Sequence, residues 1–289
     1  MSEVLRLNNL SYTYAVKTPF EKNAVKNVNL SVNKGEFIAV IGHTGSGKST
    51  LMQMLNGLVK PTSGQVFFEG KDIWEKPNEI GKIRFKIGMV FQYPEYQLFD
   101  ETVYKDISFG PKNMGLSDKE IDDAVRKAAK FVGLKDSLLN CSPFDLSGGE
   151  KRRAAIAGVI AMNPEVIIFD EPTAGLDPMG KETLLSQIVQ YHKKQNNTIL
   201  FVSHSMEDVA KIADRIIVMN NSEVVMFEKT KDIFKNSSEL EKIGLTVPQI
   251  TKIMILLKDK GYDIPDGILT VEDAFRVITS LLKKEGKIW

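Results

Sequence analysis

The stretch Gly42-His43-Thr44-Gly45-Ser46-Gly47-Lys48-Ser49 decides how this chain is interpreted. It fits the pattern G-x-x-x-x-G-K-[ST], a loop that binds the phosphates of a nucleoside triphosphate. Its glycines let backbone N–H groups approach an anion without a Cβ clash, and the positive end of the following helix adds to the attraction. We expect Lys48 to neutralise the β- and γ-phosphates and the Ser49 hydroxyl to bind Mg²⁺. The predicted nucleotide-binding residues here are Gly42, His43, Thr44, Gly45, Ser46, Gly47, Lys48, Ser49 and Thr50.

The sequence on both sides of this loop supports a strand–loop–helix unit. Residues 37–41 before it are continuously apolar, and after it apolar residues recur at helical spacing, at Leu51, Met54, Leu55 and Leu58. Two further runs, 166–169 and 199–202, are also continuously apolar. Such runs are typical of central strands in a parallel sheet that is covered on both faces. The chain therefore predicts an α/β fold.

Residues that can bind a metal ion or take part in catalysis follow these apolar runs. In an open α/β sheet, ligands bind at the carboxyl ends of the strands. After the run 166–169, we expect Asp170 to hold Mg²⁺ and Glu171 to orient and deprotonate the attacking water. After other runs, we expect His204 to reach the γ-phosphate and Gln92 to contact the metal and the water. Taken alone, these last two are more typical of structural residues, and the upstream loop is what favours a catalytic interpretation.

A second glycine motif, Leu146-Ser147-Gly148-Gly149-Glu150, precedes an expected helix. One interpretation is structural: Ser147 caps the helix, and Glu150 closes a capping box. The other is functional, because a helix N-terminus with a serine and two bare glycines is an anion site. One γ-phosphate does not need two such sites from the same chain. We therefore predict that this motif serves nucleotide bound to another subunit.

Composition narrows the function classes. The 289 residues carry 38 Lys+Arg and 37 Asp+Glu, and a net charge of +1 argues against a dedicated nucleic-acid binder. A hydrophobic content of 43% supports a sizeable core. The single cysteine, Cys141, excludes an intramolecular disulfide and a multi-cysteine zinc site. Neither an apolar run near the ~18 residues of a membrane span nor a signal core is found, so we expect any membrane role to act through a partner.

The sequence pattern changes after about residue 229, which predicts a nucleotide-binding domain, 1–229, and a helical tail, 230–289. Residues 92–163 are predicted to form a largely helical insertion, which includes a capping box at Ser117–Glu120. Within the tail, residues 236–238 are polar and typical of a linker. Two apolar helical stripes follow, and they fit packing against the body or each other, or alternatively a dimer contact.

Together these residues resemble an ATP-binding-cassette (ABC) ATPase over residues 3–229. The correspondence comprises Walker A at 42–49, the Q-loop Gln92, the signature 146–150 with Glu150 where the commonest form has Gln, Walker B at 166–170 with catalytic Glu171, a D-loop at 174–177, and the switch His204. By position, Tyr14 resembles the aromatic residue that stacks on adenine, with Tyr12 as the substitute.

The resemblance implies a P-loop NTPase cassette: an α/β fold with a mixed sheet core, an antiparallel β portion, a helical signature subdomain and here a small helical C-terminal appendix. It implies two cassettes paired head to tail with ATP and Mg²⁺ between them. Walker A of one chain would face the signature residues Ser147, Gly148, Gly149 and Glu150 of the other, with Asp177 also at the nucleotide. Mg²⁺ would be held by Ser49, Gln92 and Asp170.

Within the family, the chain is most similar to the ATPase of an energy-coupling-factor (ECF) importer of vitamins or transition-metal ions. The similarity lies in residues 11–14 with the loop 18–21, in residues 91–99, and in the helical tail. It implies a second, paralogous ATPase, a transmembrane subunit, a substrate-binding membrane subunit, and a peripheral position at the cytoplasmic face of the cell membrane. The aromatic stretch 93–99 would dock a helix of the transmembrane subunit. The cargo cannot be deduced from this chain.

Two alternatives remain at this stage. A soluble ABC ATPase acting on nucleic acid or ribosomes is disfavoured by the near-neutral charge, by the single cassette and by the absence of a coiled-coil heptad run. A nucleotide-binding regulator without turnover is disfavoured by Asp170, Glu171 and His204, which are all present.

Overall fold

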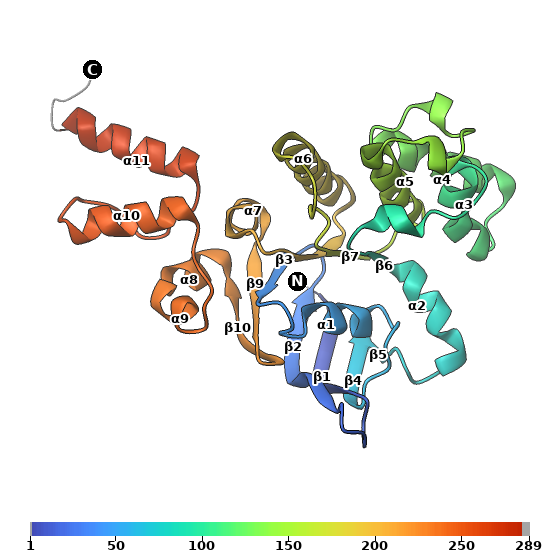
Figure 1. Cartoon of the computed structure of the whole chain (residues 1–289), viewed down its shortest axis with the longest axis horizontal. Helices are drawn as coiled ribbons and strands as arrows, with labels where there is room; N and C mark the ends of the chain where they lie inside the picture. The colour runs from blue at the N-terminus through green and yellow to red at the C-terminus, as the bar shows by residue number, and fades with distance from the viewer. Residues whose placement is uncertain (1, 285–289) are drawn as a thin grey trace.

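A computed structural model describes residues 2–284 of the chain (Figure 1). Met1, which falls in the predicted domain 1–229, and residues 285–289 of the predicted tail 230–289 lie outside the described residues. The described part contains two sheets, a helical lobe on one side and helices of the tail on the other (Figure 1). The predicted α/β class and the cassette architecture are confirmed.

The larger sheet carries the apolar runs of the sequence at its centre. Its strand order is β10-β9-β3-β8-β7-β6, in which β10 is antiparallel to β9 and all other neighbours are parallel. Every residue of β3, β6, β7 and β8 is buried, which explains why these strands lack polar alternation. The strands are β3 (Phe37–Gly42), β6 (Ile87–Val90), β7 (Val166–Asp170), β8 (Thr198–Val202), β9 (Arg215–Asn220) and β10 (Glu223–Lys229).

The smaller sheet is antiparallel and has the order β2-β1-β4-β5. Buried and exposed residues alternate over parts of β1 and β2, as expected for strands with one face on the core. The strands are β1 (Glu3–Tyr14), β2 (Lys22–Asn33), β4 (Ser63–Phe68) and β5 (Lys71–Asp72). β1 ends at Tyr14, beside the phosphate loop.

Helix α1 (Lys48–Leu55) follows the phosphate loop and is shorter than the sequence predicts. The prediction that Leu58 lies on this helix is wrong. Asn56 caps it, and Gly57 leaves it with a φ of +72°. This φ is one that residues with a side chain rarely adopt, and a Cβ on Gly57 would also lie 2.6 Å from Cδ1 of Ile80, so glycine is favoured at this turn. Leu58 is consequently 40% exposed.

Residues 92–163 contain helices and loops and form the lobe at the right of Figure 1. Both helix starts predicted from capping boxes are confirmed, at Ser117 and at Ser147. The helices of this lobe are η2 (Pro94–Gln97), α3 (Val103–Asn113), α4 (Asp118–Phe131), η3 (Asp136–Leu138), η4 (Pro143–Asp145) and α5 (Gly148–Ile160). The apolar faces of α3, α4 and α5 share one hydrophobic cluster with β7, β8 and α6 (Pro178–Gln195).

The first helices of the tail, α8 (Thr230–Lys235) and α9 (Ser237–Lys242), pack on the body. The interpretation of residues 236–238 as a linker is wrong, because α9 begins at Ser237. Leu240 anchors this short helix: it is fully buried, in one cluster with Ile41 of β3 and Val209 of α7 (Met206–Ile212).

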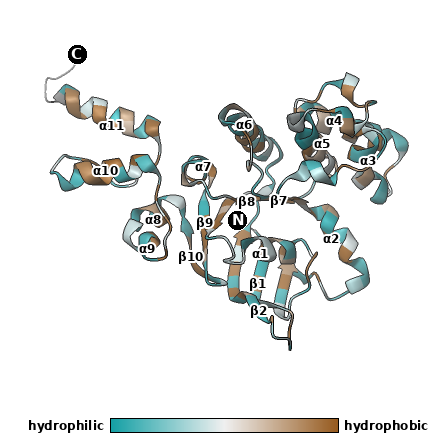
Figure 2. Ribbon diagram, viewed as in Figure 1, coloured by the Kyte–Doolittle hydropathy of each residue, from teal (hydrophilic) through white to brown (hydrophobic). Residues whose placement is uncertain are grey.

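The last two helices pack chiefly on each other. α10 (Gln249–Asp259) and α11 (Val271–Lys284) enclose a small cluster built on Met254, Ile264 and Ala274. Both helices carry apolar residues, seen as brown segments that alternate with polar ones along α10 and α11 (Figure 2). Leu256 is 60% exposed and Phe275 is 71% exposed, so an apolar face remains uncovered in the single chain. The expectation that this face makes a dimer contact stays a prediction.

Candidate active site

The phosphate loop joins β3 to α1 at the carboxyl edge of the parallel sheet. Two of its glycines are required by close approach of the backbone. A Cβ on Gly42 would lie 2.3 Å from the carbonyl oxygen of Met219, and one on Gly47 would lie 2.0 Å from that of Ala24. Both glycines also have positive φ, 153° and 103°. The loop is therefore held tightly between β9 and β2, which fixes where its N–H groups point.

Lys48 lies inside this loop and is only 5% exposed. Its Nζ donates to the carbonyl oxygens of Gly42 and His43, at 2.7 and 2.9 Å. Burial lowers the pKa of Lys48, and the negative charges of Glu171 and Asp170 partly oppose that effect. A buried ammonium that is bound only by neutral carbonyls is stabilised when a negatively charged phosphate approaches it.

Asp170 lies at the end of β7 and is 5% exposed. Burial raises the pKa of its carboxyl, while a hydrogen bond with Ser49 and the charge of Lys48 oppose the rise. Its Oδ1 is buried without a hydrogen-bond partner. A divalent cation would compensate this oxygen, and Mg²⁺ is commonly bound by one or two carboxylates together with substrate phosphates and water. The residues present therefore fit Mg²⁺, although within residues 2–284 no three His, Cys, Asp or Glu residues form a metal-binding group.

The three predicted catalytic side chains converge. Glu171 Oε1 lies 2.5 Å from His204 Nε2, and Gln92 Nε2 donates to Glu171 Oε2 at 3.3 Å. They come from segments after β7, β8 and β6, which are neighbouring strands of one sheet. Glu171 has a φ of 50°, a conformation that is unusual for a non-glycine residue and that is often found at functional sites.

Of the two tyrosines proposed for the adenine, Tyr14 borders the phosphate loop. Its hydroxyl lies 3.0 Å from Oγ1 of Thr50 on α1, and the residue is 41% exposed. Tyr12 packs against the core of the antiparallel sheet and meets Tyr14 edge to face, with ring centroids 4.8 Å apart. An exposed ring beside the loop is the arrangement that base stacking needs.

The signature residues are not brought to this cluster. Ser147, Gly148, Gly149 and Glu150 start α5 in the helical lobe, whereas α1 lies at the centre of the molecule (Figure 1). The Glu150 carboxylate accepts hydrogen bonds from the backbone N–H of Ser147 at 2.9 Å and from its hydroxyl at 2.6 Å. A Cβ on Gly148 would meet nothing within 4 Å. Asp177 accepts a hydrogen bond from the N–H of Gly180 at 2.7 Å and thereby caps α6.

Arg152 on α5 belongs to none of the sequence motifs, yet it is only 5% exposed. Its Nε and Nη2 donate to the two carboxylate oxygens of Glu95, at 3.0 and 2.8 Å, and its Nη1 donates to the carbonyls of Pro172 and Ala174. Burial opposes the charge on Glu95, yet the pKa of Glu95 is lowered because Arg152 binds it. One side chain thus ties the signature helix to the segment after Gln92 and to the loop after Glu171. Its only sequence signal is one basic residue in the run Lys151-Arg152-Arg153.

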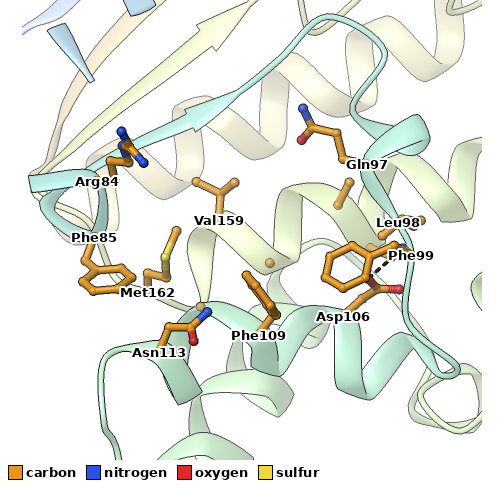
Figure 3. Close-up of a pocket in the computed structure, with 14 residues that line it drawn as sticks. Arg84, Phe85, Gln97, Leu98, Phe99, Asp106, Phe109, Asn113, Val159 and Met162 are labelled. Carbon is orange, nitrogen blue, oxygen red and sulfur yellow. Dashed lines mark hydrogen bonds between the residues drawn. The ribbon is translucent and has the colours of Figure 1, made fainter. Parts of the chain in front are cut away.

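A groove of about 250 Å³ lies on the outside of the helical lobe (Figure 3). The predicted docking stretch 93–99 contributes only its last three residues, while Tyr93 and Tyr96 pack on each other with centroids 6.1 Å apart. The remaining lining comes from α2 (Ile80–Lys86), α3 and α5 and from Met162, which follows α5. It includes Arg84, Phe85, Gln97, Leu98, Phe99, Asp106, Phe109, Val159 and Met162.

Asp106 is the acidic group of this groove. Its Oδ1 accepts hydrogen bonds from the N–H groups of Phe99 and Asp100, at 3.1 and 3.2 Å. Its Oδ2 is buried without a partner, and burial raises the pKa of this carboxyl. Beside it, the rings of Phe99 and Phe109 meet edge to face at 5.2 Å and are 62% and 50% exposed. The groove therefore combines an apolar surface with one unsatisfied acceptor.

The chain is similar to known ATP-binding proteins, in agreement with the nucleotide-binding site described above. A sequence model of the family described as "ABC transporter" matches residues 25–174. The chain is 53% identical to the energy-coupling factor transporter ATP-binding protein EcfA2 of Clostridium perfringens, over 98% of this chain and 99% of that protein. It is 52% identical to the protein of the same name from Clostridium acetobutylicum, over 96% and 98%.

Solved structures give the same result. A structure titled cbiO1 from Clostridium perfringens, part of the ABC transporter complex cbiONQ, superposes with a TM-score of 0.74 at 38% identity, over 89% of this chain and 100% of that one. A dimeric ATP-binding cassette in a post-hydrolysis state, bound to ADP and Pi, gives a TM-score of 0.71 at 31% identity, over 78% and 98%. Transporter names favour the transporter interpretation over a soluble ATPase acting on nucleic acid or ribosomes. The chain belongs to the ABC transporter family, as an ATP-binding and ATP-hydrolysing transport subunit.

Proposed function

We propose that this chain is the ATPase of an ECF importer, in which it binds ATP with Mg²⁺ and couples hydrolysis to uptake of a vitamin or transition-metal ion. The observation that carries ATP hydrolysis is the contact of Glu171 with both His204 and Gln92 at the strand ends beside the phosphate loop, and the importer type is supported by the 53% identity to an ECF transporter ATP-binding protein. A carboxylate held by two neighbours at this position is suited to accept a proton from water.

Each residue of the cluster has a task in hydrolysis. Lys48 leaves its two carbonyl partners for the β- and γ-phosphates, and the loop N–H groups bind the same oxygens. Ser49, Asp170 and Gln92 would hold Mg²⁺, which neutralises charge on the phosphates when it is bound. Glu171 orients and deprotonates the attacking water. His204, on the other side of Glu171, orients that carboxylate and contacts the γ-phosphate. Tyr14 stacks on the adenine.

The second anion site belongs to the partner's nucleotide. The helix start at Ser147 presents bare glycines to solvent, far from the phosphate loop of its own chain. A head-to-tail pair would bring it, together with Asp177, to the ATP of the other cassette. We propose that this other cassette is a paralogue, so that the pair is a heterodimer.

The groove at Phe99 would receive a helix of the transmembrane subunit. Apolar surface with exposed aromatic rings favours a hydrophobic helix face, and the unpartnered Oδ2 of Asp106 favours an arginine or lysine on that helix. Within residues 2–284, no helix has the length and hydrophobicity of a membrane span. A peripheral position at the cytoplasmic face, beside a transmembrane and a substrate-binding subunit, follows from this docking.

Co-purification from detergent extracts tests the proposal. The chain is expressed with its membrane partners, and the variants Phe99→Ala and Asp106→Asn are compared with Phe20→Ala, which removes an exposed ring that does not line the groove. We expect the first two to recover less of the hydrophobic partner and to retain ATP binding, while Phe20→Ala behaves as the unaltered chain. Full recovery with both groove variants would contradict docking at this groove, and recovery only with ribosomes or DNA would contradict the transporter function.

A further inference from the structure

One residue of the phosphate loop is connected to the C-terminal tail. His43 Nε2 lies 2.6 Å from the carbonyl oxygen of Ile243, a residue 200 positions later in the chain. Because a carbonyl only accepts, Nε2 must donate, which fixes the proton of a neutral ring on this nitrogen. The backbone carbonyl of the same histidine accepts from Lys48 Nζ at 2.9 Å and from the N–H of Ser46 at 3.1 Å. His43 therefore contacts the tail with its side chain and the phosphate-binding lysine with its backbone.

The tail side of this contact is shaped for the ring. Gly244 follows Ile243 and has a φ of +72°, which closes α9. A Cβ on Gly244 would lie 2.8 Å from Nε2 and 3.1 Å from Cε1 of His43. A side chain at this position would thus displace the imidazole, in addition to straining the backbone.

The tail segment is also fixed to the body. Leu240 and Leu245 on either side of the contact are 0% and 8% exposed, and Val247 is 1% exposed. All three belong to the hydrophobic cluster that includes Ile41, the residue before the phosphate loop. The partner of His43 is therefore part of a packed surface that also includes the strand leading into the phosphate loop.

We infer that His43 is a positioning residue, through which residues 240–247 of the tail set the conformation of the phosphate loop and hence its affinity for ATP. The inference rests on the ATP binding of the proposed function. When Lys48 moves from the His43 carbonyl to a phosphate, the side-chain bond to Ile243 keeps the loop in place. A partner that binds the tail would change nucleotide affinity through the same contact.

Glycine variants of the tail test this without altering the loop. Gly244→Ala is compared with Gly261→Ala, which also places alanine at positive φ, +91°, but where a Cβ meets nothing within 4 Å. The full chain is used, and the Kd of Mg-ATP is measured by titration calorimetry. We expect Gly244→Ala to weaken binding about two- to tenfold, as loss of one hydrogen bond predicts, and Gly261→Ala to leave it unchanged. Equal Kd values for the two variants would overturn the inference.

A double-mutant cycle separates the contact from general destabilisation. In a His43→Ala background the ring is gone, so Gly244→Ala should change the Kd less than about twofold. The same loss in both backgrounds would show that the glycine acts elsewhere. If Gly244→Ala does not fold, His43→Gln and His43→Leu replace it, and the amide donor of Gln should preserve affinity better than Leu. Equal affinity of these two would refute the contact. Failure of the unaltered chain to bind Mg-ATP would instead refute the proposed function.

Discussion

The core around the phosphate loop and the start of the signature helix differ in how their functional groups are satisfied. In the core, Glu171 contacts His204 and Gln92, and Lys48 is bound by loop carbonyls. At the signature, the side chains of Ser147 and Glu150 hydrogen-bond within their own capping box, and a Cβ on Gly148 would meet nothing within 4 Å. The core is assembled within the chain. We propose that the signature is an anion site whose ligand is the nucleotide of a second cassette.

The proposed function needs both regions, the core around the phosphate loop and the signature helix start, in one chain. Hydrolytic side chains need neighbours that hold them in position, and strand ends of one sheet supply these neighbours. A helix N-terminus needs only its own cap to keep its N–H groups oriented, so it can be presented at a surface. Variants that affect one region and spare the other test this comparison.

The largest expected effect is on the core, from Glu171→Gln. The amide cannot accept the proton of water, so the turnover number should fall by about 10²- to 10⁴-fold, whereas ATP binding is retained. Steady-state phosphate release and nucleotide titration measure the two properties. Glu182→Gln, an exposed glutamate on α6, serves as the control. Normal turnover in Glu171→Gln would show that another group is the base.

Lys48→Ala should abolish most of the affinity for ATP. A charge-assisted hydrogen bond contributes about 1.5–3 kcal/mol, which corresponds to a loss of roughly 10- to 150-fold in binding. Lys119→Ala, an exposed lysine on α4, should bind normally. Calorimetry that finds unchanged affinity in Lys48→Ala would remove this lysine from the site.

Arg152→Lys tests the buried tie between the two regions. Lysine cannot make the two-pronged contact with Glu95, and Glu95 stays mostly buried. We expect the free energy of unfolding to fall by about 1–3 kcal/mol, measured by denaturant titration. Arg126→Lys, in an exposed ion pair with Asp122, should cost less than about 1 kcal/mol. Equal losses would mean that Arg152 adds nothing beyond a surface pair.

The smallest expected change in stability comes from replacing two matched serines, which should differ in their effect on ATP turnover. Ser147 and Ser117 both form capping boxes with a glutamate three residues on. Replacing either by alanine should cost about 1 kcal/mol of stability. Only Ser147→Ala should also lower ATP turnover by the assembled cassette pair, because only that helix start faces a nucleotide. A fall in turnover with Ser117→Ala as well would attribute the effect to stability alone.

Motifs carried by continuous segments could be predicted from the sequence. The phosphate loop, the strand ends at Asp170 and His204, and the capping box at Ser147 each depend on local backbone geometry. The meeting of Gln92, Glu171 and His204 could also be expected, because the carboxyl ends of parallel strands lie at one edge.

Contacts that depend on tertiary packing could not be predicted. Leu58 fits the helical period, but α1 ends before it and Gly57 takes a positive φ. Residues 236–238 are polar, and burial of Leu240 makes them part of a helix. The aromatic residues of 93–99 predict a docking stretch, but the groove at Phe99 is lined mostly by α2, α3 and α5. The bond between His43 and Ile243 spans 200 residues and leaves no periodic signal.

The most direct test of the account is the ATP turnover per chain as a function of protein concentration, with and without the partner cassette. Because each nucleotide would need a helix start from a second cassette, we predict that turnover per chain falls on dilution and recovers when the partner is added. Turnover per chain that stays constant on dilution and does not change in Ser147→Ala would show that one chain completes its own site.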